Sequence, residues 1–283
     1  MPHGERRIGD VEVVSLCDGV IVTSEPATES FPGGTTEVWV EARERYPDVF
    51  GGEGWRLHVR STLLRSDGHT ILVDTGVGPA SAPAYAWSAI RGELPIELKA
   101  AGVDPADVET VVITHVHDDH LGWNVVEGGT EPLFANARYL IHRADWELMT
   151  SSDDEEDRAI FEALLSPLER SDVLEISGDR TAITSELTLV HAPGHTPGHQ
   201  VVLIDSRDER AIVTGDLVNH PVQLLQPGVN GTTDAEPERA AATRAAFLER
   251  IEREDRLVVP THLAEPFGRF ERDGERWSWR PVD

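Results

Sequence analysis

The segment that most constrains this chain is His115-Val116-His117-Asp118-Asp119-His120, which follows a short apolar run at residues 111–113. An apolar, β-branched run of this length predicts a buried strand, so the polar residues lie on the loop at its C-terminal end. Loops at the carboxyl ends of strands carry the chemistry of α/β proteins, because a rigid scaffold positions them. Imidazoles and carboxylates are also the side chains that bind transition metals. The segment therefore predicts a metal site at the end of a buried strand.

Three further candidate ligands lie at the ends of later apolar runs. They are His195 in Ala-Pro-Gly-His-Thr-Pro-Gly-His, Asp216 in Thr-Gly-Asp and His262 in Val-Val-Pro-Thr-His. A lone H-x-H-x-D-H string is weak evidence in a chain with 12 histidines, because histidine is also an ordinary surface residue. Four strand-end loops that each carry such side chains favour one converging site over a chance match.

These motifs, in this order, resemble the metallo-β-lactamase superfamily over nearly the whole chain. The resemblance implies an α/β fold, an αββα sandwich of two mixed β-sheets flanked by helices, with the metal site at one edge. It also implies two sets of metal ligands with Asp216 bridging them: His115, His117 and His195 for the first ion, and Asp119, His120 and His262 for the second. Asp74, in Leu-Val-Asp-Thr-Gly, matches the family's second-strand motif and is expected to support the ligand loop.

This ligand set predicts two divalent metal ions as cofactors. Neutral imidazoles and carboxylates suit Zn²⁺, while iron, manganese and cobalt remain alternatives. Two such ions lower the pKa of a bridging water toward 7, and the resulting hydroxide attacks a carbonyl or phosphoryl centre. Asp119 is expected to have a second, catalytic role, passing a proton from the nucleophile to the leaving group; the alternative is a role as ligand only.

The residue types around the motif favour hydrolysis of a small, neutral ester or lactone. Redox di-iron relatives resemble H-x-E-x-D-H, whereas position 117 here is histidine, which favours zinc over oxygen chemistry. Lys99 is the only lysine, which argues against an anionic substrate. The alternatives are a phosphotriester hydrolase, a glyoxalase-like thioesterase and, in another class, a metal-stabilised binding module without turnover. Glyoxalase-like relatives carry a C-terminal helical region, and this chain ends soon after His262.

Three residues are candidates for contact with the substrate. Residues 216–223, followed by a helix with Thr243 and Arg244, resemble the branch of quorum-quenching lactonases and methyl-parathion hydrolases. In that branch's acyl-homoserine lactonases, a tyrosine three residues after the bridging aspartate orients the carbonyl; here the position is Asn219, beside His220. We expect Asn219 to face the substrate and His220 to cap a loop. Trp123, the tryptophan nearest the ligands in sequence, is a third candidate, with core packing as its alternative.

Charge and composition limit the classes of molecule that this protein is expected to bind. The net charge of −26 disfavours nucleic acid and anionic membranes, although acidic surfaces also serve solubility. Cys17 is the only cysteine, so no intrachain disulfide forms. No apolar run reaches the roughly 18 residues of a membrane span, and no signal sequence is recognisable, so we expect a cytoplasmic enzyme with a small-molecule substrate, as a monomer or homodimer.

The length and the absence of a linker predict a single domain over residues 1–283. An irregular insert at residues 24–54 is interpreted as a lid, a dimer arm or an ordinary surface loop. Periodicity predicts the remaining elements. Strands are expected at 11–22, 57–65, 69–73, 137–142, 187–191, 200–204 and 211–213, helices at 36–46, 93–101, 143–149, 155–165 and 236–253, and a hairpin at 267–279.

Overall fold

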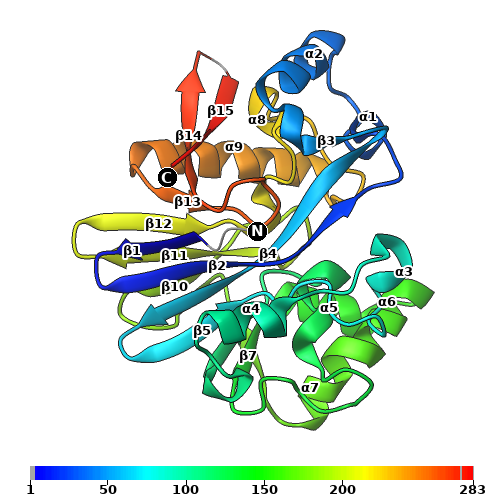
Figure 1. The fold of residues 1–283 in the computed structure, drawn as a ribbon, viewed down its shortest axis with the longest axis vertical. Coiled ribbons are helices and arrows are strands. Elements are labelled where there is room, and N and C mark those ends of the chain that lie inside the picture. Colours follow the sequence, from blue (N-terminus) through cyan, green and yellow to red (C-terminus); the bar gives the residue numbers. More distant parts are fainter. Residues whose placement is uncertain (1–3, 275, 283) are drawn as a thin grey trace.

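Two mixed β-sheets lie face to face, with helices on both outer sides, in the computed structural model of this protein (Figure 1). It describes residues 4–274 and 276–282; residues 1–3, 275 and 283, which the predicted single domain includes, lie outside the described part. The predicted αββα sandwich is confirmed.

The first sheet has the order β1-β2-β4-β5-β6-β7-β8, with β3 paired to β4. Its strands are β1 (Gly4–Ile8), β2 (Val11–Val22), β3 (Phe50–Gly51), β4 (Gly54–Ser66), β5 (His69–Val73), β6 (Thr110–Val112), β7 (Arg138–His142) and β8 (Leu174–Ser177). The strands from β5 to β8 run parallel, so their carboxyl ends lie at one edge.

The second sheet has the order β15-β14-β13-β12-β11-β10-β9. Its strands are β9 (Arg180–Ala182), β10 (Leu187–His191), β11 (Gln200–Ser206), β12 (Glu209–Val213), β13 (Leu257–Val259), β14 (Gly268–Asp273) and β15 (Arg276–Pro281). Only β12 and β13 are parallel neighbours among the described strands of this sheet, and a candidate ligand follows each of them.

Side-chain alternation along the strands builds the core in layers. On β11, Val202 and Ile204 point to the other sheet, while Val201 and Leu203 point to the outer helices. Successive strand residues face opposite sides, so a central strand buried on both faces must be apolar throughout. The continuous apolar runs of the sequence therefore mark strands with a layer on each side.

Helices cover the outer faces of both sheets. The first sheet carries α4 (Leu94–Ala100), α5 (Arg143–Ser151), α6 (Glu155–Ile160) and α7 (Ser166–Arg170), and the second carries α9 (Pro237–Arg253) (Figure 1). The predicted helix at 155–165 is α6 followed by a π-helical turn, η5 (Phe161–Leu165). The strands β1, β8 and β9 were not predicted, because they are short and carry many polar residues. Among the described residues, no helix is both long and apolar enough to span a bilayer.

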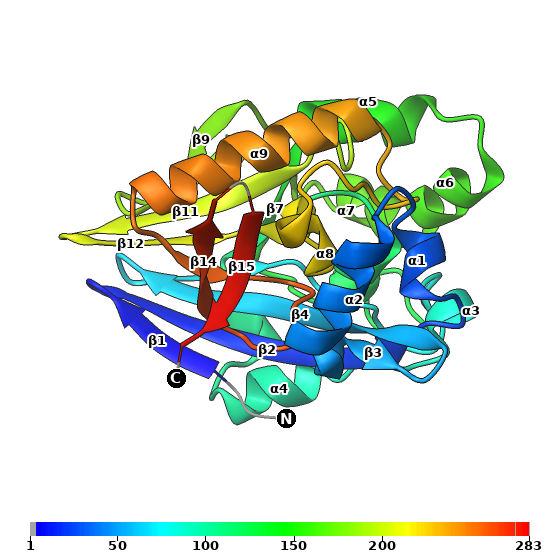
Figure 2. The ribbon, with the colours of Figure 1, turned by 90° about the horizontal axis from the view of Figure 1, so that it is seen from above.

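The insert at residues 24–54 is more regular than expected. It forms α1 (Ala27–Ser30), α2 (Thr36–Arg45), the 3₁₀ turn η1 (Pro47–Val49) and β3, and packs beside α8 (Val222–Leu225) (Figure 2). The N-cap Thr35 accepts a hydrogen bond from Val38 N, which starts α2 as capping predicts. Phe31 and Trp39 of the insert pack with Trp55 of β4 in a hydrophobic cluster that also includes residues of β2 and α8.

We predict that Ile204→Ala lowers the free energy of unfolding by about 2–5 kcal/mol, because it opens a cavity between the sheets. Ile204 is fully buried there. The matched control Ile96→Ala, at a residue that is 57% exposed on α4, should change stability by less than about 0.5 kcal/mol. Denaturant titration of both variants measures the difference; equal losses would contradict the layered core.

Candidate metal centre

The ends of the strands bring all seven predicted ligands together. The loop after β6, with its 3₁₀ turn η3 (Asp118–His120), faces the loops after β10, β12 and β13. Two groups form, each with ligand atoms within 4.8 Å of one another: His115, His117, His195 and Asp216 in the first, and Asp119, His120 and His262 in the second.

Asp216 lies between the two groups. Its Oδ2 is 3.2 Å from His195 Nε2, and its Oδ1 is 3.2 Å from His120 Nε2 and 3.0 Å from His262 Nε2. Oδ1 is buried and has no hydrogen-bond partner in the described structure. A buried carboxylate in this position requires positive charge on both sides.

In three of the ligand histidines, the ring nitrogen that points away from the site, Nδ1, contacts a fixed partner. His195 Nδ1 is 2.7 Å from Asp234 Oδ1, and His262 Nδ1 donates to the His58 carbonyl at 2.6 Å. His115 Nδ1 lies 3.0 Å from Thr114 Oγ1. A partner on one ring nitrogen sets the tautomer and aims the other nitrogen's lone pair. The Nε2 atoms of these histidines therefore point into the site.

Asp74 supports the ligand loop, as the motif suggested. One carboxylate oxygen accepts from Thr114 N at 2.8 Å; the other accepts from Thr114 Oγ1 at 2.8 Å and lies 2.9 Å from His120 Nδ1. The backbone of Asp74 has a φ of 60°, which is uncommon for a residue other than glycine. This conformation turns a strand-end carboxylate toward the next loop.

His199 positions Asp216 through the backbone. Its Nδ1 donates to the Ala192 carbonyl at 2.9 Å, and its Nε2 accepts from Asp216 N at 2.9 Å. Gly215 precedes Asp216 with a φ of 49°, and a Cβ there would lie 2.7 Å from His199 Nε2. A side chain at position 215 would therefore push apart the contact that holds Asp216.

The ligand atoms are crowded in a way that fits a bound cation. His117 Nδ1 lies 3.1 Å from His115 Nε2 and 2.9 Å from His195 Nε2, and His120 Nε2 lies 3.3 Å from His262 Nε2. Each close pair is a hydrogen bond in one choice of tautomers; with both nitrogens deprotonated, it would instead suit a cation bound between them. Ligands about 2.0–2.1 Å from a tetrahedral Zn²⁺ are themselves about 3.3 Å apart. The donor set thus fits metal ions.

The pKa values of the candidate ligands shift in both directions. Burial opposes the charged forms of His195 and His262, yet the carboxylate of Asp216 raises the pKa of both, that of His195 to about 9. Burial, reinforced by neighbouring imidazoles, lowers the pKa of His115 and His117 well below the usual value, which leaves them neutral. Burial alone would raise the pKa of Asp216, but the surrounding histidines hold it well below its usual range. Burial opposes the charged form of His120, yet the carboxylates, that of Asp216 first, raise its pKa well above its usual value. Metal binding requires neutral imidazole, so a cation at His120 displaces a proton.

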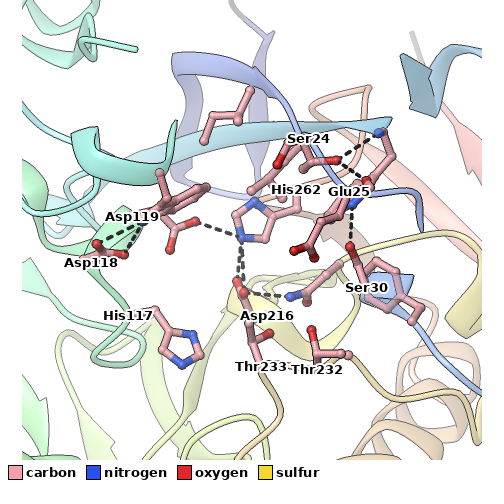
Figure 3. A pocket seen from close by; sticks show the side chains of 18 of the residues that line it. Ser24, Glu25, Ser30, His117, Asp118, Asp119, Asp216, Thr232, Thr233 and His262 are labelled. Carbon is pink, nitrogen blue, oxygen red and sulfur yellow. Dashed lines mark hydrogen bonds and ion pairs between the residues drawn. The ribbon is translucent and has the colours of Figure 1, made fainter. Parts of the chain in front are cut away.

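A pocket of about 550 Å³ opens over these residues (Figure 3). His117, Asp119, Asp216 and His262 lie at its base, with the insert on one side. Asn219 also lines the pocket; its Nδ2 donates to Asp216 Oδ2 at 2.9 Å, and its Oδ1 is buried without a partner. Residues of the insert, among them Glu25, Ser30 and Phe31, line one side of the pocket.

Trp123 and His220, the other two candidates for contact with the substrate, lie outside the pocket lining, in line with the alternatives of core packing for Trp123 and a structural role for His220. Trp123 is in the core, and its Nε1 donates to the buried Asp18 at 3.1 Å. His220 is fully buried among four aromatic rings, and its Nδ1 accepts from Val222 N at 3.1 Å. Both rings are packed within the protein; Trp123 Nε1 and His220 Nδ1 are hydrogen-bonded there, while His220 Nε2 is buried without a hydrogen-bond partner among the described residues.

Sequence reasoning missed Asp234 and the role of His199. Asp234 accepts a hydrogen bond from Gly231 N and lies 3.5 Å from Arg244. These two contacts hold its carboxylate in position beside His195. Asp234 lies in a polar loop without a recognisable motif, so the sequence did not indicate its contact with His195. His199 was visible in the Pro-Gly-His repeat at residues 193–199, but its contact with Asp216 depends on how the two loops pack.

Comparison with known proteins gives relatives with named activities. An N-acyl homoserine lactonase from Bacillus sp is 30% identical over 169 residues, which are 55% of this chain and 61% of that lactonase. The matched part is thus less than two thirds of the relative's own length.

Solved structures share the fold over almost the whole chain. The hydrolase AbOPH superposes with a TM-score of 0.86 at 22% identity, covering 99% of this chain and 97% of that one. AidC, a dizinc quorum-quenching lactonase in complex with the product N-hexanoyl-L-homoserine, superposes with a TM-score of 0.85 at 22% identity, with the same coverage. At these identities the likeness concerns the fold alone.

The family model of the metallo-β-lactamase superfamily matches residues 54–262, which hold every candidate ligand and most of the chain. This chain belongs to the metallo-β-lactamase superfamily.

Proposed function

We propose that this protein is a dinuclear metal-dependent hydrolase that opens a lactone or ester bond in a small substrate without anionic groups. The observation that carries the proposal is the position of Asp216, whose two oxygens contact both groups of candidate ligands at the base of an open pocket. The named activity of the lactonase relative supports the choice of bond.

The first group, with His115, His117 and His195, would hold one divalent ion, and the second, with Asp119, His120 and His262, another; Asp216 would contact both. Zinc is the proposed metal because imidazole and carboxylate suit it. Bound metals of this kind supply a water of lowered pKa and polarise the substrate's oxygen.

Asp119 is placed to move a proton. It lines the pocket, is 8% exposed and makes no hydrogen bond with the described residues; its Oδ2 lies 3.7 Å from both His120 Nε2 and His262 Nε2. We propose that it accepts the proton of the nucleophile and delivers it to the leaving oxygen. A carboxylate at the border of pocket and ligands can serve both as ligand and as proton carrier.

Asn219 is placed to orient the substrate's carbonyl. One amide hydrogen is used by Asp216, and the amide also lines the pocket, so its second hydrogen can be donated to a bound oxygen. Apolar side chains then bind the remainder of the substrate and exclude water. They are Ile21, Phe31, Trp55, Leu57 and Ile160.

A substrate panel tests the proposal. Metal-loaded protein should hydrolyse an acyl lactone or an activated carboxylic ester in a chelator-sensitive manner, with about two metals bound per chain. Faster turnover of a phosphotriester or a thioester would favour those alternatives. Two bound metals with no turnover across the panel would favour the binding module.

We predict that Asp216→Ala reduces kcat by at least about 10³-fold and lowers the metal content, because the shared carboxylate no longer separates two cations. Elemental analysis and lactone kinetics on the same sample measure both effects. Asp208→Ala, at an exposed residue far from the pocket lining, is the matched control and should retain both. Full metal loading of the Asp216 variant would contradict the bridging role.

We predict that Asn219→Ala lowers kcat by about 10² with metal content intact, since it removes one donor to the developing oxyanion. His220→Ala should instead lower the melting temperature, because it empties an aromatic cluster. Calorimetry and kinetics separate the two roles. An Asn219→Ala enzyme with unchanged kcat on the best substrate would show that the amide is not used.

A further inference from the structure

The pocket that leads to the candidate metal centre is lined by acidic residues and by no lysine or arginine. Beyond Asp119 and Asp216, four carboxylates line it: Glu25, Asp118, Glu156 and Asp157. They come from opposite sides, since Glu25 belongs to the insert and Asp118 to the ligand loop (Figure 3). The pocket is a ligand site on independent grounds, because the two groups of candidate metal ligands lie at its base and the buried Oδ1 of Asn219, in its lining, has no hydrogen-bond partner among the described residues.

Asp118 is the most deeply buried of these four carboxylates. It is only 9% exposed, and no Lys, Arg or His lies within ion-pair distance of it in the part of the chain that the structure describes. Its contact is the indole of Trp87, whose Nε1 donates to both oxygens at 3.2 and 3.1 Å. A neutral donor leaves most of the charge of a buried carboxylate uncompensated.

Bound metals do not remove this excess of negative charge. Two divalent ions exceed the charge of their two carboxylate ligands, Asp119 and Asp216, by about two units, whereas four further carboxylates line the pocket. The acidic residues of α6 also suit the start of a helix, which explains their presence on the helix but not the absence of a basic residue across the pocket.

Trp87 adds an aromatic face beside these charges. It lies on the short helix α3 (Tyr85–Ser88), lines the pocket and is 46% exposed. Its two hydrogen bonds to Asp118 fix the indole in place. An anchored indole next to carboxylates is the arrangement that binds organic ammonium groups, through cation–π attraction and charge.

We propose that the substrate carries a cationic ammonium group, which the indole of Trp87 and the carboxylates of Asp118 and Glu156 bind at the mouth of the pocket. This inference rests on the proposed hydrolysis of an ester or lactone and adds the charge of its substituent. The reacting bond lies at the metal ligands, while the cation occupies the outer, acidic part.

The test uses two pairs of isosteres that differ only in a quaternary nitrogen replacing a carbon. Butyrylcholine and neohexyl butyrate are compared as substrates of the metal-loaded enzyme, and choline and neohexyl alcohol as ligands in binding titrations followed by tryptophan fluorescence. At low ionic strength we expect kcat/KM for the cationic ester to exceed that of the neutral ester by about tenfold, and choline to bind correspondingly tighter. Added sodium chloride should reduce both preferences.

Single-residue variants test which side chains cause the preference for the cationic ester. Glu156→Gln should lower the cation preference about threefold, and Trp87→Leu should lower it and abolish most of the fluorescence change. Glu155→Gln is the matched control, since it removes a charge from the same turn of α6 at a residue that does not line the pocket. It should leave the preference unchanged.

Equal kcat/KM for the two esters, or equal loss of preference in the Glu155 and Glu156 variants, would overturn the inference while leaving the hydrolase intact. Choline that binds no tighter than neohexyl alcohol would also overturn it, whether or not either ester is turned over. Failure of the metal-loaded protein to hydrolyse any ester or lactone would instead remove the proposed function, and the binding titration would still decide the charge preference.

Discussion

The structure depends on holding a buried carboxylate, Asp216, between two groups of buried imidazoles. Nitrogens of His115, His117 and His195 approach within about 3 Å in this site, a spacing that a metal ion bound between them would suit. The surrounding structure holds the candidate ligands in place by other contacts. Asp74 contacts His120, Asp234 contacts His195, and the carbonyl of His58 accepts a hydrogen bond from His262.

Those three supports come from different parts of the fold. Asp74 follows a strand of the first sheet, His58 lies on the same sheet's longest strand, and Asp234 precedes the helix that covers the second sheet. The histidines they orient come from both sheets as well. The site's geometry therefore exists only when the two sheets are packed face to face, and the apolar layer between them maintains the distances at the edge.

Much of this arrangement was predictable from the sequence. The ligand motifs lie directly after apolar runs, which predict buried strands and one converging site at their ends. The resemblance of these motifs to the metallo-β-lactamase superfamily implied the sandwich and the seven ligands. Contacts that depend on loop packing could not be predicted. Trp123 is near the ligands in sequence, yet its indole reaches back to Asp18, more than a hundred residues away. Asp234 has no motif, and only the docking of its loop on Arg244 and His195 shows its position.

The residues that line the outer pocket lie on segments separate from the strands that position the ligands. Phe31 belongs to the insert, Trp87 to a four-residue helix and Glu156 to the start of a helix. None of these side chains supplies the hydrogen bonds that orient the ligand histidines through Nδ1. Mutations in these segments can alter which molecule is accepted without disturbing the buried centre. Exposed positions such as Glu156 are open to divergence in selectivity at little cost in folding stability, whereas Phe31 is also part of a buried aromatic cluster.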